Sequence, residues 1–283
     1  MRRIWVCGAN GRVGNALQYY FDPMDIELLL TDKEEVDVTD SEEVTLFAER
    51  LRPFAIINCA GFTDPVACEK DPDRAYAVNG LGARNVAIAS QTVNAKLVHL
   101  STDDVFNGFA NTPYREYDMV DPQTIYGKSK KFGEDFVRGF CHKHFIIRTS
   151  WLYSPINRRV EEIIEQAKKG ETIYMPKNKT ASPTSVYELA QFISQIIESY
   201  DYGTFHASCQ GKASRKEWAE KILELANVRG KVEMVEKDER SIYRPDYTVL
   251  DNYILRISGL YDFPSWEKAL KGYIKNEGLV NHG

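Results

Sequence analysis

The chain has 283 residues and a net charge of −5, with 43% hydrophobic and 27% charged residues. This length fits one large domain or two modest ones, since domains usually hold ~100–200 residues, and the composition is ordinary for a soluble globular protein. The net negative charge argues against nucleic acid as a partner, because binding to nucleic acid requires clustered Lys and Arg.

Three further patterns in the sequence argue against a disulfide-bonded, a metal-binding and a membrane-spanning protein. The five cysteines are widely spaced without any Cys-x-x-Cys pair, which favours reduced thiols over a disulfide framework or a zinc site. The five histidines show no ligand spacing, so we expect no metal site. No segment approaches the ~18 consecutive apolar residues of a membrane span. We therefore expect a cytoplasmic protein without a membrane partner.

Strand-like and helix-like segments alternate through the first half of the chain. Apolar runs predict strands at residues 3–7, 27–31, 55–60, 96–100 and 145–148. Apolar faces at helical spacing and capping residues predict helices between them, at residues 15–21, 39–52, 74–92 and 125–141. This alternation predicts an α/β fold with a Rossmann-type, doubly wound parallel sheet that helices cover on both faces.

The regular alternation weakens in the second half of the chain. Helices are predicted at residues 159–169, 186–200, 214–226 and 265–275, with scattered short strands. We predict an NAD(P)-binding domain at residues 1–153 and a smaller, mostly helical substrate-binding region at residues 154–283. The two are expected to share some interleaved chain and to enclose a cleft.

A glycine-rich turn follows the first predicted strand and opens a helix. Its glycines are Gly8, Gly11 and Gly14, spaced Gly-x-x-Gly-x-x-Gly where Gly-x-Gly-x-x-Gly is commoner. Glycines let the backbone approach a pyrophosphate, and the N-terminus of the helix favours the anion. The turn therefore predicts a dinucleotide cofactor.

The residues after the second strand bear on which cofactor binds. Asp32 closes that strand, where an acid can bind both hydroxyls of an adenosine ribose and favour NADH. Arg12 and Lys33 lie nearby in the sequence, and each is suited to meet the 2′-phosphate of NADPH. Asp37 and Val38 follow, in a position to meet the adenine. The sequence leaves the choice between NADPH and NADH open.

A proton-transfer centre is predicted further along the chain from Thr102, Tyr126 and Lys130. Tyr126 precedes Lys130 by four residues on a predicted helix, so both side chains lie on one face. An ammonium near a phenol favours the phenolate, so the pKa of Tyr126 is expected to fall from its usual ~10. The hydroxyl of Thr102, at the end of a strand, is placed to hydrogen-bond the same substrate oxygen.

Together these motifs resemble an extended short-chain dehydrogenase/reductase, and in particular the dTDP-4-dehydrorhamnose reductase family. The resemblance covers nearly the whole chain. The matching segments are residues 8–11, 52–61, 75–79, 114–116 with Pro122, 126–130 with 133–134, 148–153, 181–184, and 244–245 with 250–251. The last two segments separate this family from other extended reductases, so they carry the most weight.

The resemblance implies roles for individual residues. The cofactor-binding positions are Gly11, Arg12 and Val13 for the pyrophosphate, Asp32 for the ribose, Asp37 and Val38 for the adenine, and Gly61, Phe62, Thr63 and Leu100 for the nicotinamide side. Tyr126 is implied as the proton donor and Lys130 as its partner, which also touches the nicotinamide ribose. The positions that contact the sugar are Thr102, Asp103 and Trp151.

The implied reaction reduces the C4 ketone of a dTDP-4-keto-6-deoxyhexose. A hydride passes from the nicotinamide to C4 while Tyr126 protonates the forming alkoxide. The product is dTDP-L-rhamnose, a nucleotide sugar that serves as a polysaccharide precursor. Family members often form dimers, so the resemblance admits a homodimer, although the sequence leaves the oligomeric state open.

One position in the catalytic region departs from the family pattern. The family usually reads Ser-Thr-Asp-Tyr-Val-Phe at this strand end, but this chain has Asp104 in place of the tyrosine. Thr102-Asp103-Asp104 approaches the Thr-Asp-Glu of nucleotide-sugar 4,6-dehydratases. A dehydratase or epimerase is therefore one alternative, opposed by the short chain, the shorter acid and the C-terminal matches. A non-catalytic regulatory subunit like that of methionine adenosyltransferase is the other, opposed by the intact catalytic trio.

Overall fold

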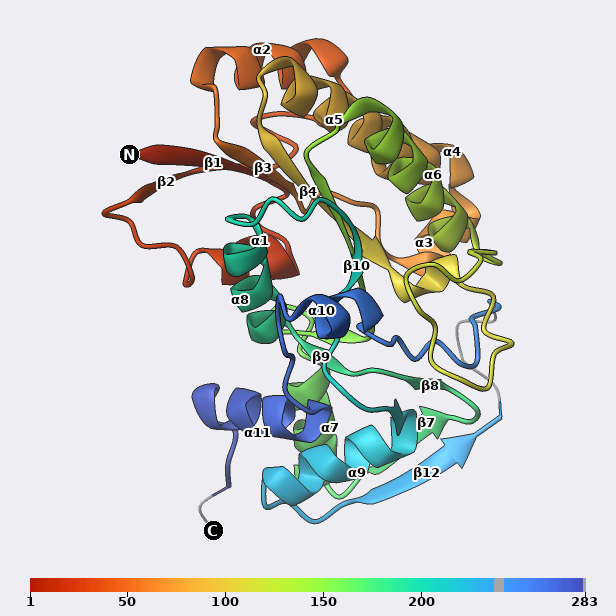
Figure 1. Cartoon of the computed structure of the whole chain (residues 1–283). Helices are drawn as coiled ribbons and strands as arrows, with labels where there is room; N and C mark the ends of the chain where they lie inside the picture. The colour runs from red at the N-terminus through yellow and green to blue at the C-terminus, as the bar shows by residue number, and fades with distance from the viewer. Residues whose placement is uncertain (237–241, 282–283) are drawn as a thin grey trace.

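The structure is a computed structural model that describes residues 1–236 and 242–281 (Figure 1). Its centre is a six-stranded sheet in the order β10-β5-β4-β3-β1-β2, and every neighbouring pair is parallel. The strands are β1 (Arg2–Cys7), β2 (Ile26–Thr31), β3 (Ala55–Asn58), β4 (Lys96–Thr102), β5 (His144–Thr149) and β10 (Gly203–His206). The predicted α/β fold with a parallel, Rossmann-type sheet is confirmed.

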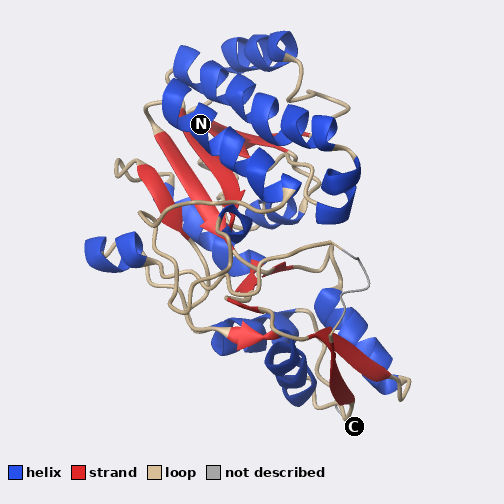
Figure 2. Ribbon diagram, turned by 90° about the vertical axis from the view of Figure 1, so that its right-hand side faces the viewer, coloured by secondary structure: helices blue, strands red, loops and turns tan. Residues whose placement is uncertain are grey.

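Alternate residues of each central strand enter two different hydrophobic cores. Ile4 and Val6 of β1 pack in one core with α1 (Arg12–Leu17) and α8 (Val186–Ile196). Trp5 and Cys7 pack on the opposite face, in a core shared with α2 (Ser41–Leu51), α5 (Ala83–Thr92) and α6 (Ile125–Phe140). Both faces of the sheet are therefore covered, as apolar strands without polar alternation require (Figures 1 and 2).

The segment predicted as one helix at residues 74–92 is helical throughout, but a π-helical turn divides it. The structure has α3 (Pro65–Lys70), α4 (Pro72–Tyr76) and a π-helical turn (Ala77–Gly82) before α5 begins. The wide turn contains Asn79, whose side chain bonds the backbone N–H and C=O of Phe62 and the hydroxyl of Ser129. Such insertions are common at functional sites, and this one links the loop after β3 to α6.

The C-terminal half builds a second core from α7 (Arg159–Lys168), α9 (Arg215–Leu225) and α11 (Trp266–Asn276). The parallel pair β7 (Thr172–Pro176) and β12 (Lys231–Val235) packs against these helices. Short pairs complete it: β6 (Leu152–Tyr153) with β9 (Thr184–Ser185), and β8 (Thr180–Ala181) with β11 (Ala213–Ser214). This agrees with a mostly helical region that has scattered short strands.

The chain crosses back from the second half into the first. Helix α8 packs on α1, and β10 extends the central sheet beside β5, with α10 (Tyr253–Ser258) in contact with β10. The sequence prediction allowed for such interleaving, and its boundary at residue 153 stays a prediction.

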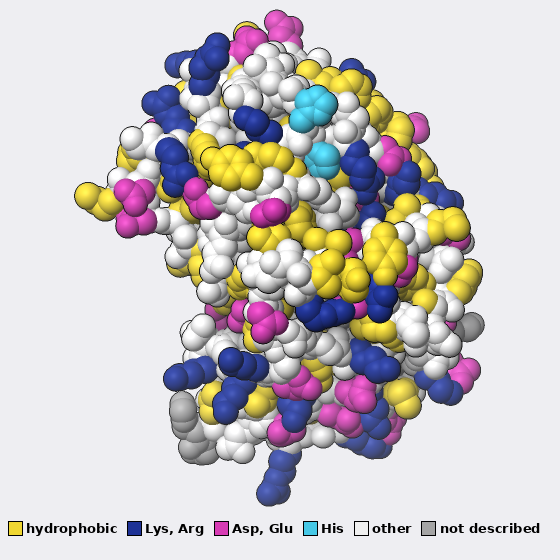
Figure 3. All heavy atoms as spheres, in the orientation of Figure 1, with side chains coloured by type: hydrophobic (Ala, Val, Ile, Leu, Met, Phe, Trp, Pro, Cys, Tyr) yellow, Lys and Arg dark blue, Asp and Glu magenta, His cyan; other side chains and the backbone are white. Residues whose placement is uncertain are grey.

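The cysteines, the helix lengths and the surface charges bear on the remaining predictions. All five cysteines are free thiols. Within residues 1–236 and 242–281, no helix has both the length and the apolar character needed to cross a membrane. On the face shown in Figure 3, Lys and Arg side chains lie interspersed with Asp and Glu.

Candidate active site

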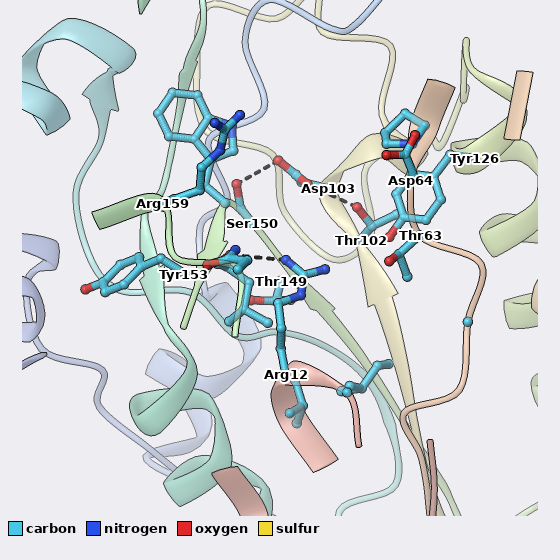
Figure 4. A pocket seen from close by; sticks show the side chains of 18 of the residues that line it. Arg12, Thr63, Asp64, Thr102, Asp103, Tyr126, Thr149, Ser150, Tyr153 and Arg159 are labelled. Carbon is cyan, nitrogen blue, oxygen red and sulfur yellow. Dashed lines mark hydrogen bonds between the residues drawn. The ribbon is translucent and has the colours of Figure 1, made fainter. Parts of the chain in front are cut away.

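A cavity of about 720 Å³ opens between the central sheet and the C-terminal half (Figure 4). The glycine turn after β1 forms one wall, and the carboxyl ends of β4 and β5 form another. Thr102, Tyr126, Lys130 and Trp151 all line this cavity. The ends of parallel strands are where open α/β sheets bind ligands, so the structure brings the predicted catalytic trio to the expected edge.

A second cavity of about 610 Å³ adjoins the first and shares Gly11 and Gly61 with it. Asp32, Asp37 and Val38 line this second cavity. All the cofactor positions predicted from the sequence line one of the two cavities, apart from Gly14. The structure therefore groups these residues as the sequence required, while their individual roles stay predictions.

The glycine turn is packed so tightly against neighbouring backbone that Gly8 and Gly14 have no room for a side chain. Its bare backbone is therefore suited to approach a dinucleotide. Gly8 has a φ of +72°, and a Cβ there would lie 2.7 Å from the backbone nitrogen of Ala60. A Cβ on Gly14 would lie 2.6 Å from the Cα of Ala9, which explains why this glycine serves packing and lies outside both cavities. At the rim, the Asp32 carboxylate accepts hydrogen bonds from the backbone N–H groups of Asn10 (3.1 Å) and Lys33 (3.0 Å).

Helix α6 begins against the segment that follows Thr102. Its N-cap Thr124 accepts a hydrogen bond from the N–H of Gly127 at 3.0 Å. A Cβ on Gly127 would lie 2.2 Å from the carbonyl oxygen of Asp104, so only glycine lets the first turn of α6 approach this close. That approach places Tyr126 beside Thr102, which acts to lower its pKa.

The expected fall in the pKa of Tyr126 is wrong for this structure. Burial raises the pKa of Tyr126 to about 12, and the negative charge of Asp104 adds to the rise. Arg12 and Arg244 oppose the rise only in part. Burial of Tyr126 outweighs any effect of Lys130, and burial also lowers the pKa of Lys130 itself to about 8, against the charge of Glu134. Tyr126 is thus a neutral phenol, which suits a proton donor.

Asp103 ties together three segments at the floor of the cavity. Its carboxylate accepts hydrogen bonds from Ser150 (2.7 Å), Thr248 (2.5 Å) and Thr102 (3.1 Å), two of which are drawn in Figure 4. Burial, and then the neighbouring charge of Asp104, raise the pKa of Asp103 to about 6. The sequence predicted a sugar contact here, and the structure adds a role in joining β4, β5 and the C-terminal loop.

Glu134 lies about two turns further along the same helix than Tyr126 and is fully buried. It accepts two hydrogen bonds from Arg148 (2.9 and 2.8 Å), one from Arg138 (2.7 Å) and one from Ser101 (2.6 Å). Burial opposes its charge, but the hydrogen bonds and charge of Arg148 together lower the pKa of Glu134 to about 2. This network fixes α6 to β4 and β5 behind the cavity.

Trp151 stands on the opposite wall with a strained backbone. Its φ is +38°, which is unusual for a bulky side chain and typical of functional sites. The guanidinium of Arg215 stacks on its ring at 3.4 Å from the centroid. Trp151, Arg215, Arg159 and Arg244 also line a third cavity of about 460 Å³ on the far side of this wall.

The three arginines of this wall were missed as site residues. Arg244 lies in a segment that matched the family, but no role was assigned to it from the sequence. Arg159 and Arg215 begin helices, where a charged residue is usually solvated, so no local signal marks them. They line the same two cavities only because separate parts of the C-terminal half fold together. Among the described residues, no group of three or more His, Cys, Asp or Glu side chains is placed to hold a metal ion.

Nearly the whole chain is similar to known proteins. The profile of the family described as RmlD substrate binding domain matches residues 1–278. The spore coat polysaccharide biosynthesis protein SpsK of Bacillus subtilis (strain 168) is 33% identical over 278 residues, covering 97% of this chain and 98% of that protein. The dTDP-4-keto-6-deoxy-D-glucose reductase of Streptomyces niveus is 31% identical and covers 94% of each chain.

A solved structure extends this likeness to three dimensions. The dTDP-4-dehydrorhamnose reductase from Bacillus anthracis str. Ames, in complex with NADP, has a TM-score of 0.94 with this chain at 39% identity. The match covers 98% of this chain and 100% of that one. The similarity therefore includes both the sheet and the C-terminal half, and with them every wall of the cavity.

Proposed function

The chain belongs to the RmlD family of dTDP-4-dehydrorhamnose reductases, and from this premise we propose that it reduces the C4 ketone of a dTDP-4-keto-6-deoxyhexose to give dTDP-L-rhamnose. NADPH or NADH is the reductant. The observation that carries this proposal is the single cavity in which Thr102, Tyr126 and Lys130 meet the glycine turn. A proton donor and a site for a hydride donor are thereby adjacent.

The residues present fit a nicotinamide dinucleotide. Close packing at Gly8 and Gly14 leaves the backbone of the turn free of side chains, and α1 points its N-terminus at the cavity. When bound, the cofactor supplies the hydride. Arg12 and Val13 would lie against the pyrophosphate, and Asp32 would bind the ribose hydroxyls. Lys130 would reach the nicotinamide ribose from α6.

The protein groups then act on the ketone oxygen. Tyr126, kept protonated by burial, donates its proton to that oxygen as negative charge develops on it. In the structure Thr102 donates its one hydroxyl hydrogen to Asp103, which holds the side chain in place before the substrate binds. When the substrate binds, the hydroxyl turns that hydrogen to the same ketone oxygen, and the ammonium of Lys130 stabilises the phenolate that remains. The trio therefore directs the proton and steadies the charge.

Location and assembly follow from the same proposal. We propose that the protein works in the cytoplasm, where nicotinamide cofactors and nucleotide sugars meet and where its five free thiols stay reduced. The dTDP-sugar is its partner, and nucleic acid is not, given the net charge of −5. A homodimer stays a prediction, which light scattering of the purified chain tests.

Purified protein mixed with the dTDP-4-keto-6-deoxy sugar tests the reaction directly. We expect absorbance at the nicotinamide band to fall with NADPH or NADH, and NMR of the product to show dTDP-L-rhamnose. No loss of absorbance with either cofactor would contradict the proposal. Water elimination from dTDP-glucose without net cofactor consumption would identify a dehydratase instead. Tight binding to a synthetase subunit without any turnover would identify a regulatory subunit.

A further inference from the structure

Asp104 is the position at which the catalytic region departs from its family, and the reaction above leaves it without a role. It lies in the 3₁₀ turn (Asp103–Val105) that follows β4, and only 2% of it is exposed. Its carboxylate meets the Arg244 guanidinium, with Nη2 at 3.0 Å from one oxygen and 3.1 Å from the other. The two residues are 140 positions apart in the chain.

Arg244 stands where two cavities meet. It lines the catalytic cavity and also the 460 Å³ cavity beyond the Trp151 wall. Its side chain is 28% exposed, so part of it remains open to these spaces. Its Nε is buried and makes no hydrogen bond within the described part of the chain. A planar guanidinium that binds a carboxylate through one nitrogen keeps further N–H groups for a second anion.

We propose that Asp104 is a positioning residue that acts through Arg244. Its carboxylate holds the guanidinium at the junction of the two cavities, so that the remaining N–H groups bind an anionic oxygen of the nucleoside diphosphate part of the substrate. This inference rests on the proposed function, because it assumes a nucleotide-sugar substrate. Without the carboxylate, the long Arg244 side chain would lose its fixed geometry and the substrate would meet a disordered cation.

The same pair also acts on Tyr126 through charge. The charged groups that face Tyr126 are Asp104 from the 3₁₀ turn, Arg12 from α1, Arg244 from the C-terminal loop, Lys130 from its own helix, and Asp64 and Asp103, which line the same cavity (Figure 4). Asp104 raises the pKa of Tyr126, whereas Arg244 lowers it. Loss of either partner therefore shifts this pKa in opposite directions, a signature that a purely structural pair would not give.

Steady-state kinetics of D104N, R244Q and the double variant test the proposal. The matched control is D135N, which removes an exposed carboxylate from the same helix as Tyr126. We expect D104N to raise KM for the nucleotide sugar by ~10–100-fold, the usual worth of a hydrogen bond to a charged group, with KM for NADPH unchanged. The double variant should be no worse than R244Q alone, because Asp104 has nothing left to position.

The pH dependence of kcat gives the second readout. Activity needs protonated Tyr126 and charged Lys130, so it falls as pH rises through the pKa values of these two groups. A nearby carboxylate raises the pKa of either kind of group, and a nearby guanidinium lowers it. We expect this alkaline limb to move to lower pH in D104N and to higher pH in R244Q. Variants that change only the melting temperature, with KM and pH profile as in the wild type, would overturn the proposal. So would effects of D104N and R244Q that multiply in the double variant.

Two further measurements keep the proposal testable on its own. If D104N does not fold, R244K keeps the charge but loses the forked geometry, and it should raise KM for the sugar while leaving the alkaline limb near that of the wild type. Titration calorimetry with dTDP needs no turnover. Weaker dTDP binding in D104N than in D135N would support the positioning role even if the wild type failed to reduce the sugar, whereas equal binding would overturn it.

Discussion

The two ends of α6 bury ionisable side chains in opposite ways. At its start, Tyr126 and Lys130 face a cavity, and burial shifts both pKa values toward the neutral forms, to about 12 and about 8. Towards its end, Glu134 is surrounded by Arg148, Arg138 and Ser101, and its pKa falls to about 2, which stabilises the charged form. Tyr126, at the cavity end, and Glu134, at the scaffold end, lie about two helical turns apart.

The difference shows how one helix can serve both reaction and scaffold. At Tyr126 and Lys130 burial outweighs the nearby charges, which leaves these two groups in forms that a bound substrate or cofactor can change. Burial with several charged partners leaves Glu134 in one state at any physiological pH. The fixed end holds the helix so that the tunable end keeps its geometry, because Glu134 joins α6 to Arg148 of β5 and Ser101 of β4.

The largest effect is expected at the cavity end, from Tyr126→Phe. Removing the hydroxyl removes the proton donor but little packing, so kcat should fall by ~10²–10⁴ while the melting temperature and NADPH binding stay near wild type. Stopped-flow or steady-state loss of nicotinamide absorbance measures the rate. Tyr200→Phe, at a site 79% exposed, is the matched control and should leave kcat unchanged. An unchanged rate in Tyr126→Phe would remove Tyr126 as the acid.

At the scaffold end, Glu134→Gln should act mainly on stability, with a smaller effect on chemistry through Lys130, whose pKa the charge of Glu134 raises. The change keeps the shape of the side chain but leaves Arg148, only 3% exposed, without its anion. Breaking one side of a buried ion pair costs ~3–5 kcal/mol, which urea unfolding should detect. Glu27→Gln removes an exposed pair with Arg3 and should cost less than ~1 kcal/mol. If the two variants lost equal stability, the contrast between the ends of α6 would fail.

The sequence predicted the cavity end better than the scaffold end. Tyr126 and Lys130 lie four residues apart on one helix, predicted at 125–141 and observed at 125–140, so local spacing was enough. The pKa of Tyr126 was predicted in the wrong direction, because burial and the charge of Asp104 depend on the folded site. Glu134 and Arg148 matched the family, but their pairing depends on β5 lying beside β4, which local sequence does not encode.

The same limit applies to the rest of the site. The glycine turn and Asp32 were placed correctly because strand, turn and acid follow one another within the first 32 residues. The Asp104–Arg244 pair joins segments 140 residues apart. The π-helical turn at 77–82 was missed because it is stabilised by contacts of Asn79 with the loop after β3 and with α6, and not by helix propensity. Long-range contacts therefore account for most of what was missed.

The smallest effect expected is a difference in how the stability contributed by two buried acids, Glu134 and Asp103, depends on pH. Because the pKa of Glu134 is about 2 in the folded chain and 4.5 ordinarily, its stabilisation is complete above pH 4.5 and is lost as pH falls towards 2. Asp103 behaves oppositely: its pKa is raised from 3.8 to about 6, so the stability it contributes is complete below pH 3.8 and is lost as pH rises through 6.

Unfolding free energies of Glu134→Gln, Asp103→Asn and the wild type between pH 3 and 8 measure this difference. One carboxylate changes the free energy of unfolding by at most about 1.4 kcal/mol per pH unit. The deficit of Glu134→Gln relative to wild type should shrink below pH 4.5, because the wild type then loses what the variant lacks. The wild type should gain on Asp103→Asn between pH 6 and 4. Parallel curves for all three proteins would show that the buried acids titrate alike, and the contrast between the scaffold and the cavity would not hold.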